Sequence, residues 1–247
     1  MNILETKGLC KDYGAGNILT DISFQVGKGE YVAVMGQSGC GKSTLLYCVS
    51  GMDQPSSGER YFSGKNMTEM SEKQMQELRL SKMGFVFQKT SFLKNLSIID
   101  NIVYPAFQQG KEKRTEILGR AQALMEEMGI ASVAEHDVYQ VSGGQLQRAA
   151  ICRAMINQPE ILFGDELTGA LNSSATQDVC RLIDQIHQRG TTVLLVTHDA
   201  KVALHAERIV YLEDGRILDM LSLGKYEEEK AAERAFQMDA WLKKMHF

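Results

Sequence analysis

The chain has 247 residues, and its 27 Lys and Arg stand against 31 Asp and Glu, a formal net charge of −4. Hydrophobic residues make up 44% and charged residues 23%, values typical of a globular protein that is long enough to bury a core without disulfides or metals. This composition excludes collagen-like and proline-rich chains, and the mild acidity argues against a nucleic-acid binder.

The sequence also indicates where the chain works. No apolar run reaches the roughly 18–20 residues that a membrane-spanning helix needs. Residues 1–13 mix charged with apolar side chains, so they do not read as a signal peptide. The five cysteines have no C-x-x-C spacing, which favours a reducing compartment. We therefore expect a cytoplasmic chain.

In the first part of the chain, turn signals divide residues 1–30 into several antiparallel strands. Residues 31–35 are all apolar, which predicts a strand buried on both faces. A helix is expected over 42–50, with Gly51 ending it, and residues 58–64 have the pattern of another strand.

From about residue 71 the pattern becomes helical, with Met75, Leu78 and Met83 on one stripe, and a short strand is expected at 84–87. Residues 97–156 are mostly helical. Strands at 161–163, 191–196 and 209–212 then alternate with a helix at 174–188, which predicts a mostly parallel sheet covered by helices. We expect a main domain over 1–222 with a helical subdomain inserted at about 90–157, and a helical extension over 223–247.

The most specific motif is G-x-x-x-x-G-K-[ST], which residues 36–43 match between a predicted strand and a predicted helix. Glycines let backbone N–H groups surround phosphates, and the helix N-terminus adds its positive end. Lys42 can reach the β- and γ-phosphates, and the Ser43 hydroxyl can bind Mg²⁺. A glycine-rich turn with a chance lysine is the alternative.

Two further segments carry chemistry. Asp165 and Glu166 follow an apolar strand, and because successive residues of a strand face opposite ways, Asp165 can face Mg²⁺ while Glu166 orients an attacking water. Ser142, Gly143, Gly144 and Gln145 begin a helix and predict a second anion site. Two such helix ends suggest a dimer in which one chain's Ser142 loop closes on the nucleotide of the other.

Together these motifs resemble the nucleotide-binding subunit of ATP-binding cassette (ABC) transporters over about residues 1–222. The resemblance implies a RecA-like P-loop NTPase fold with an antiparallel β subdomain and a helical subdomain, and an ATPase that uses ATP and Mg²⁺. It implies that Lys42, Gln88, Glu166 and His198 are catalytic and that Ser43, Gln88 and Asp165 hold Mg²⁺. The ATP-binding residues that it implies are Tyr13 (stacked on adenine), Gly36, Gln37, Ser38, Gly39, Cys40, Gly41, Lys42, Ser43, Thr44, Ser142, Gly143, Gly144 and Gln145.

The chain departs from the family pattern at two positions near Glu166. Leu167 stands where the family has proline, which predicts a less rigid loop, and Asn172 replaces an aspartate that touches the opposite nucleotide loop. Cys40 lies among the phosphate-binding groups beside Lys42, a setting that can lower the pKa of a thiol; an unreactive filler is the alternative.

The resemblance also implies a homodimer at the cytoplasmic face of the membrane, docked on a permease and without nucleic acid. We expect Phe92, Leu93 and Leu96 to line the docking groove, with ordinary core packing as the alternative. Residues 50–55, 84–88, 100–102 and 169–172 together are most similar to the macrolide-exporter and lipoprotein-release group, and Asn172 to its branch for resistance to peptide antibiotics. The cargo is set by the permease.

Two other functions compete with this interpretation. A soluble ATPase of DNA repair would insert a long coiled coil between the phosphate loop and Ser142, and one of translation would carry two cassettes. Here roughly a hundred residues intervene and one cassette is present, which disfavours this alternative. A nucleotide sensor without hydrolysis is disfavoured by Glu166 and His198. The extension either packs on a partner or forms a solvated surface helix.

Overall fold

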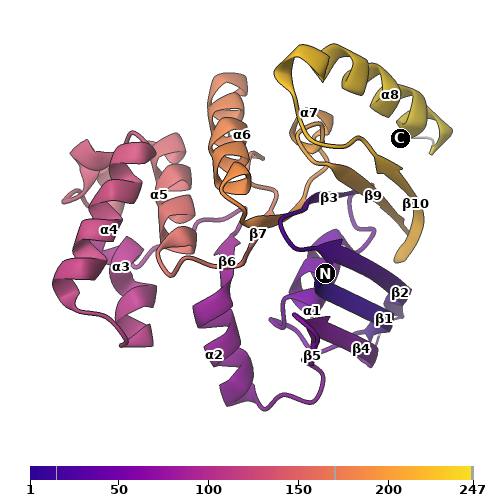
Figure 1. Cartoon of the computed structure of the whole chain (residues 1–247), viewed down its shortest axis with the longest axis horizontal. Coiled ribbons are helices and arrows are strands. Elements are labelled where there is room, and N and C mark those ends of the chain that lie inside the picture. Colours follow the sequence, from indigo (N-terminus) through magenta and orange to yellow (C-terminus); the bar gives the residue numbers. More distant parts are fainter. Residues whose placement is uncertain (15, 170, 246–247) are drawn as a thin grey trace. The chain divides into compact units, whose positions relative to one another are not determined.

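The computed structural model describes residues 1–14, 16–169 and 171–245. The chain divides into two compact units, one of residues Met1–Met75 with His187–Phe247 and the other of Gln76–Ile186. The boundaries fall inside two helices, α2 (Glu72–Lys82) and α6 (Ser173–Gln188), whose places in the chain are visible in Figure 1. This division does not test the expected domain bounds, which stay a prediction.

The first unit begins with an antiparallel sheet of strand order β2-β1-β4-β5. Apolar residues at alternate positions of β2 are buried, as a sheet with one face on a core requires. The expectation of antiparallel strands in residues 1–30 is thus confirmed. The strands are β1 (Asn2–Asp12), β2 (Asn17–Gly27), β4 (Ser57–Phe62) and β5 (Lys65–Asn66).

A second set of strands in this unit, in the order β10-β9-β3-β8, is mostly parallel. Strand β3 pairs in parallel with β8 and β9, and β10 pairs antiparallel with β9. Every residue of β3 and β8 is buried, which explains why their sequences are apolar except for Thr192. The bounds are β3 (Tyr31–Met35), β8 (Thr192–Val196), β9 (Arg208–Glu213) and β10 (Arg216–Ser222), with helices α1 (Lys42–Val49) and α7 (Ala200–Ala203).

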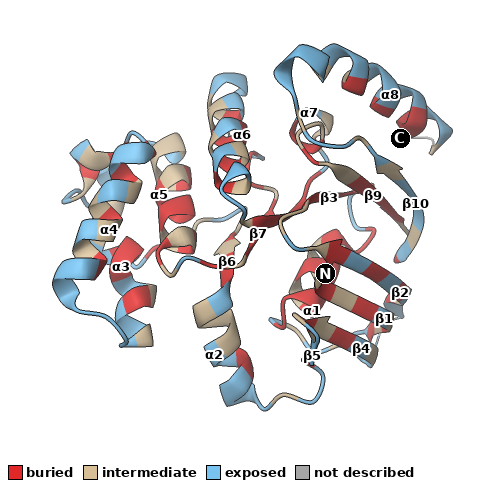
Figure 2. Cartoon of the chain, in the orientation of Figure 1, coloured by how far each residue is buried: buried red, intermediate tan, exposed pale blue. Residues whose placement is uncertain are grey.

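The C-terminal helix α8 (Ala231–Lys244), which follows a short 3₁₀ turn (Glu228–Lys230), packs on the sheet of its own chain. Trp241 is buried, its indole N–H donates to Asp219 of β10 at 2.8 Å, and its ring meets Tyr211 of β9 edge-on. Figure 2 shows the buried stripe along this helix. One face of this surface helix thus lies on β9 and β10 while most of its other residues are exposed, and its packing on a partner stays a prediction; residues 246–247 lie outside the described part.

The second unit joins a parallel strand pair to a group of helices. Strand β6 (Met83–Val86) pairs with β7 (Ile161–Asp165), and α5 packs on β6 so closely that a Cβ on Gly84 would lie 2.6 Å from the Ala154 carbonyl oxygen. Met83 begins this strand and does not extend the α2 stripe, which corrects the sequence prediction. The helices are α3 (Ile98–Gln109), α4 (Arg114–Glu127) and α5 (Gly143–Met155), with 3₁₀ turns at Ala131–Val133 and Val138–Gln140.

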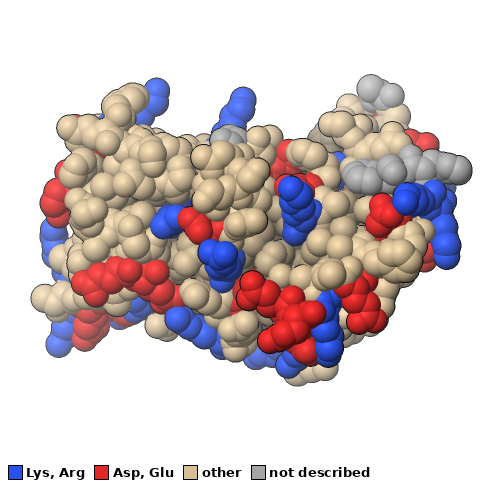
Figure 3. Space-filling model, turned by 90° about the horizontal axis from the view of Figure 1, so that it is seen from above, with Lys and Arg blue, Asp and Glu red and all other residues tan. Residues whose placement is uncertain are grey.

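Two surface properties bear on function. Within residues 1–14, 16–169 and 171–245, no helix combines the length and the apolar character that crossing a bilayer demands. Figure 3 shows Lys and Arg interspersed with Asp and Glu on the face that it displays.

Candidate functional site

The loop between β3 and α1 has the backbone of an anion cradle. Gly41 is the N-cap of α1, with φ of +103°, so no side chain at that position caps the first turn of the helix. The N–H groups of a helix's first turn have no partner within the helix and attract anions. The residues expected to bind phosphate thus lie around a helix N-terminus, as predicted from the motif.

Gly36 and Gly41 have to be glycine because backbone carbonyls of other segments approach them closely. A Cβ on Gly36 would lie 2.1 Å from the Leu212 carbonyl oxygen, and one on Gly41 would lie 2.9 Å from the Ile18 carbonyl oxygen. Both have positive φ, which favours glycine. The glycines of the motif are therefore needed to form the loop itself.

Lys42 turns its ammonium back over the loop. The side chain is buried, and Nζ donates to the carbonyl oxygens of Gly36 and Gln37 at 2.8 Å each. Neutral carbonyls are weaker acceptors for an ammonium than charged oxygens are. Phosphate oxygens entering the loop could replace these bonds with stronger ones.

The pKa of the Cys40 thiol is shifted in the direction opposite to the expected one. The side chain is buried, and burial raises the pKa of the thiol above its ordinary value although the Lys42 ammonium acts to lower it. The expectation of a lowered pKa is corrected, because the loss of water around the sulfur outweighs the nearby charge.

His198 follows β8 and is exposed. Its neighbours hold the backbone, because the Thr197 hydroxyl accepts from the Asp199 N–H at 3.0 Å and the Asp199 carboxylate accepts from the Lys201 N–H at 2.8 Å. The histidine is thus presented from a segment fixed on both sides.

In the second unit, Gln88 and Glu166 lie together. Because β6 and β7 are parallel, their carboxyl ends share one edge, and the Gln88 Nε2 donates to the Glu166 carboxylate at 3.1 Å. Glu166 has φ of +48°, a conformation that costs a non-glycine residue about 1–3 kcal/mol and is concentrated at functional sites. Asp165, the preceding residue, is buried.

Ser142 begins α5 with a reciprocal cap. Its hydroxyl accepts from the Gln145 N–H at 3.3 Å, while Gln145 Oε1 accepts from the Ser142 N–H at 2.8 Å. Asn172 caps α6 in a similar way, accepting from the Ala175 N–H at 2.9 Å. An open hollow of about 400 Å³ is lined by Ser142, Gly143, Gly144, Gln145, Arg148, Leu171, Asn172 and Ala175.

The three residues expected to meet a permease differ in exposure. Leu93 is 46% exposed, Leu96 is half-buried, and Phe92 is buried with the Arg153 guanidinium 4.5 Å from its ring centroid. Sequence reasoning missed Asn101, whose buried amide donates to the carbonyls of Leu93 and Leu96 and shapes this loop. The sequence marks residues 100–102 only as part of the resemblance and gives no sign that the Asn101 amide shapes this loop.

The expected site residues are divided between the two units. The loop at 36–44, Tyr13 and His198 belong to the first, and Gln88, Asp165, Glu166 and the Ser142 loop belong to the second. Within the first unit, Tyr13 is exposed and bonded to Asp53, a contact that sequence reasoning missed because the two lie 40 positions apart.

The comparisons with known proteins decide the family. The family model described as "ABC transporter" matches residues 19–169. The chain belongs to the ABC transporter family. The resemblance seen in the sequence is confirmed, as is the prediction that the chain is an ATP-hydrolysing ABC cassette.

Among curated relatives, the macrolide export ATP-binding/permease protein MacB of Mannheimia succiniciproducens is 39% identical over 89% of this chain and 34% of its own length. The probable syringafactin export ATP-binding/permease protein SyfD of Pseudomonas syringae pv. syringae is 40% identical over 87% of this chain and 34% of its own length. The chain thus spans about a third of these relatives. Similarity to the macrolide-exporter group is confirmed; the branch for peptide antibiotics stays a prediction.

Among solved structures, the ATP-binding cassette MJ0796, a dimer in a post-hydrolysis state bound to ADP and Pi, matches with a TM-score of 0.84 at 32% identity. The match covers 90% of this chain and all of that one. The predicted α/β fold of P-loop NTPases is confirmed.

Proposed function

We propose that this chain binds and hydrolyses MgATP as a homodimer and thereby drives a membrane permease of the export type. The observation that carries the proposal is the cradle at 36–44, where an uncapped helix N-terminus, close-approach glycines and a buried lysine converge. Residues 1–222 would form the cassette and 223–247 its extension.

The residues present fit a triphosphate and its metal ion. A Cβ would fill the loop at Gly36, and Lys42 can exchange two carbonyl acceptors for phosphate oxygens. Ser43, Gln88 and Asp165 carry the oxygen donors that Mg²⁺ prefers. When bound, Mg²⁺ neutralises charge that develops on the phosphates.

Hydrolysis then depends on the residues of this chain. Glu166 would accept the proton of the attacking water, and Gln88, already bonded to Glu166 at 3.1 Å, would orient both. Lys42 and His198 would stabilise charge on the transferred phosphoryl group. Tyr13 would stack on the base.

Dimerisation would bring the Ser142 loop of one copy onto the nucleotide of the other. The hollow beside Ser142 provides the space, and Gly143 and Gly144 leave backbone N–H groups accessible at the start of α5. MJ0796, which matches over its whole length, is itself described as a dimer. Asn172 lines the same hollow, so its side chain would lie at the contact between the two copies.

The permease is inferred from the matched relatives, which are named ATP-binding/permease proteins and are about three times as long as the matching region. We propose that the exposed Leu93, together with the half-buried Leu96 and the buried Phe92 of the same loop, receives a permease segment at the cytoplasmic face of the membrane. The Asn101 amide holds this loop in a fixed shape. No nucleic acid is expected at the site.

Hydrolysis is tested with Glu166→Gln and with Glu135→Gln as the matched control, since Glu135 is an exposed carboxylate of the same unit. The Glu166 variant should bind MgATP with unchanged affinity but lose at least about a hundredfold in kcat, because the water loses its base. The control should retain full activity. Hydrolysis at the wild-type rate by Glu166→Gln would remove this residue from the mechanism.

Docking is tested with Leu93→Glu, measured by co-purification with a co-expressed membrane permease of the export type. We expect the variant to retain its own ATPase activity and to lose the permease, because a buried charge in an apolar contact is costly. Loss of ATP binding instead would show that Leu93 serves the internal packing of the chain.

A further inference from the structure

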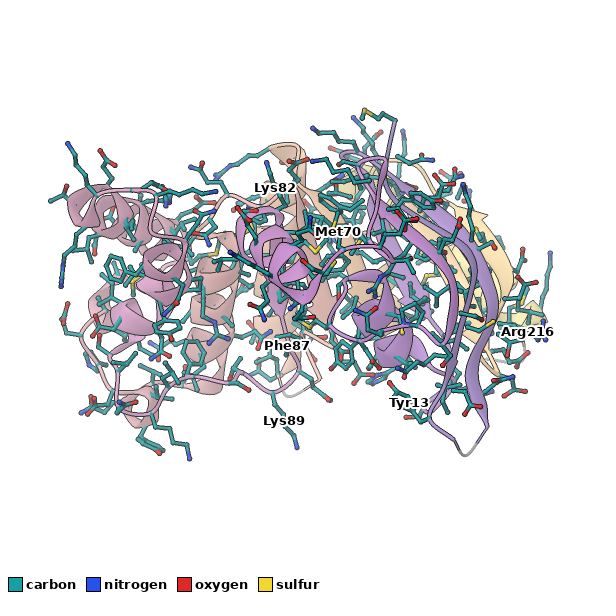
Figure 4. All side chains as sticks on the ribbon, turned by 90° about the horizontal axis from the view of Figure 1, so that it is seen from below. Tyr13, Met70, Lys82, Phe87, Lys89 and Arg216 are labelled. Carbon is teal, nitrogen blue, oxygen red and sulfur yellow. The ribbon has the colours of Figure 1, made fainter. Side chains whose placement is uncertain are left out.

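Tyr13 is an exposed aromatic residue that is nevertheless held at two points. It follows β1, is 59% exposed, and lies beside the β1–β2 hairpin in Figure 4. Its hydroxyl donates to Asp53 Oδ2 at 2.5 Å, and the Lys11 ammonium lies 4.5 Å from the centroid of its ring. The hydrogen bond to Asp53 fixes the hydroxyl end of the ring, and the Lys11 ammonium lies against one of its faces.

The two groups that hold the ring are themselves fixed. Lys11 is buried, and its ammonium donates to Asp53 Oδ1 at 2.7 Å and to the Gln54 carbonyl at 2.6 Å. Burial acts to raise the pKa of Asp53, but the bonds from Lys11 and Tyr13 outweigh it and leave that pKa below its ordinary value. Asp53 therefore stays a carboxylate that can keep both partners.

Arg60 holds the loop that carries Asp53 through hydrogen bonds. This side chain is fully buried, and its guanidinium donates to the carbonyl oxygens of Cys48 and Asp53 and to Gln54 Oε1 at 2.5–2.7 Å. Because the buried side chains of Arg60 and Lys11 both donate to carbonyl oxygens of this loop, the loop has little freedom to move. The Tyr13 hydroxyl is thus bonded to a rigid part of the first unit.

The network also places Tyr13 beside the phosphate loop. The Thr44 hydroxyl, in the first turn of α1, is among the groups that influence the pKa of Tyr13. An exposed hydrogen bond contributes little to folding stability, so stability alone gives a weak reason to immobilise an exposed ring. A ring fixed by its hydroxyl and backed by a cation can still take a second planar group against its accessible surface.

We propose that Asp53 and Lys11 are positioning residues that hold the Tyr13 ring as a preformed platform for the nucleobase. This inference rests on the proposed function, since it concerns the base of the same ATP. Preorganisation removes the entropy cost of ordering the ring when nucleotide binds. Because its hydroxyl is already used by Asp53, the ring holds the base by stacking.

The test compares the binding of ATP with that of inorganic tripolyphosphate, which lacks the nucleoside, by titration calorimetry on the full chain. Asp53→Ala should weaken ATP binding roughly three- to tenfold, because a less ordered ring keeps only part of the energy of one base–aromatic stack. It should leave tripolyphosphate binding unchanged. Tyr13→Phe, which removes only an exposed hydroxyl, should weaken ATP by a similar factor. Asp239→Ala, an exposed aspartate on α8, is the matched control.

A double variant separates positioning from a structural effect. In the background Tyr13→Ala, Asp53→Ala should cause no further loss of ATP affinity, because Asp53 acts through the ring. Equal weakening of both ligands, additive losses, or an Asp53→Ala variant that binds ATP like the wild type would each overturn the inference. If the wild type binds neither ligand, the proposed function fails first; if it binds both and Tyr13→Ala weakens only ATP, that function stands whatever Asp53 does.

Discussion

The phosphate loop at 36–44 and the Ser142 loop are both helix N-termini rich in glycine, yet they are built differently. At α1 the N-cap is Gly41, and Cβ atoms at Gly36 and Gly41 would collide with backbone carbonyls. At α5 the cap is Ser142, bonded reciprocally to Gln145, and a Cβ at Gly143 would meet no described heavy atom within 4 Å.

The two loops therefore contain glycine for different reasons. The phosphate loop needs its glycines to fold, and it is ready to accept an anion within a single chain. The fold of the isolated chain does not require glycine at position 143, so the space left there is available to a ligand or a second copy. The first site should therefore act in the monomer and the second only after dimerisation.

Alanine substitutions should distinguish the two loops by the largest effect, which is on the free energy of unfolding. Gly36→Ala should lower the free energy of unfolding by about 3 kcal/mol or more, because its Cβ would overlap the Leu212 carbonyl oxygen. Gly143→Ala should be neutral or raise it by up to about 1 kcal/mol, since alanine is the better helix residue. Urea unfolding of both variants measures this, and equal losses would contradict the distinction.

Changes of charge should then separate the loops in binding. Lys42→Met should weaken ATP binding by the isolated chain about ten- to a hundredfold, since it removes a charge-assisted bond to phosphate. Ser142→Asp, which keeps a good N-cap, should leave this affinity unchanged. Calorimetry on the monomer checks both, and a comparable loss with Ser142→Asp would place Ser142 on the nucleotide of its own chain.

Removal of the cap should have a smaller effect. Ser142→Ala should cost about 1 kcal/mol of stability, because the Gln145 N–H loses its acceptor at the start of α5. Thermal unfolding measures the loss, with Ser174→Ala on α6 as a control that should lie within about 0.5 kcal/mol of wild type. No change in Ser142→Ala would mean that the reciprocal cap is not formed in solution.

The smallest predicted effect is on the ionisation of the Tyr13 phenol. The hydrogen bond to Asp53 raises its pKa to about 12, because deprotonation would break the bond and place two negative charges together. With the folded pKa raised, the bond's contribution to stability is complete below the unfolded pKa of about 10 and is lost as the pH rises through 12.

NMR of ¹³Cζ-labelled tyrosine should show that Tyr13 is protonated at pH 11 in the wild type and ionises near its ordinary pKa in Asp53→Ala; Tyr13→Phe identifies the resonance. Ionisation of Tyr13 near pH 10 in the wild type would show that the bond to Asp53 does not persist in solution.

Local sequence patterns predicted much of this structure. The buried strand at 31–35 was predicted to the residue, because a fully apolar run between turn signals has few alternatives. The helix stop at Gly51 and the cap at Ser142 likewise follow from local chemistry. Strand β10 and helix α7 were missed, since β10 is largely exposed and α7 has only four residues.

The features that sequence could not supply depend on distant residues. Burial of Cys40 reversed the expected direction of its pKa, and the sequence did not predict that Leu167, at the family's proline position, would be buried. Asp53 meets Tyr13 only because β1 lies beside the loop after α1. The left-handed backbone of Glu166 has no signal in an Asp-Glu pair.

The central claim, that each nucleotide is shared between the Lys42 cradle of one copy and the Ser142 loop of another, is tested most directly by mixing two inactive variants. Lys42→Met and Ser142→Asp should each be inactive alone, since every site in either dimer carries one lesion. In an equimolar mixture half of the dimers are hybrids with one intact site, so ATPase activity should return to roughly a quarter of wild type. A mixture as inactive as its components would contradict the account.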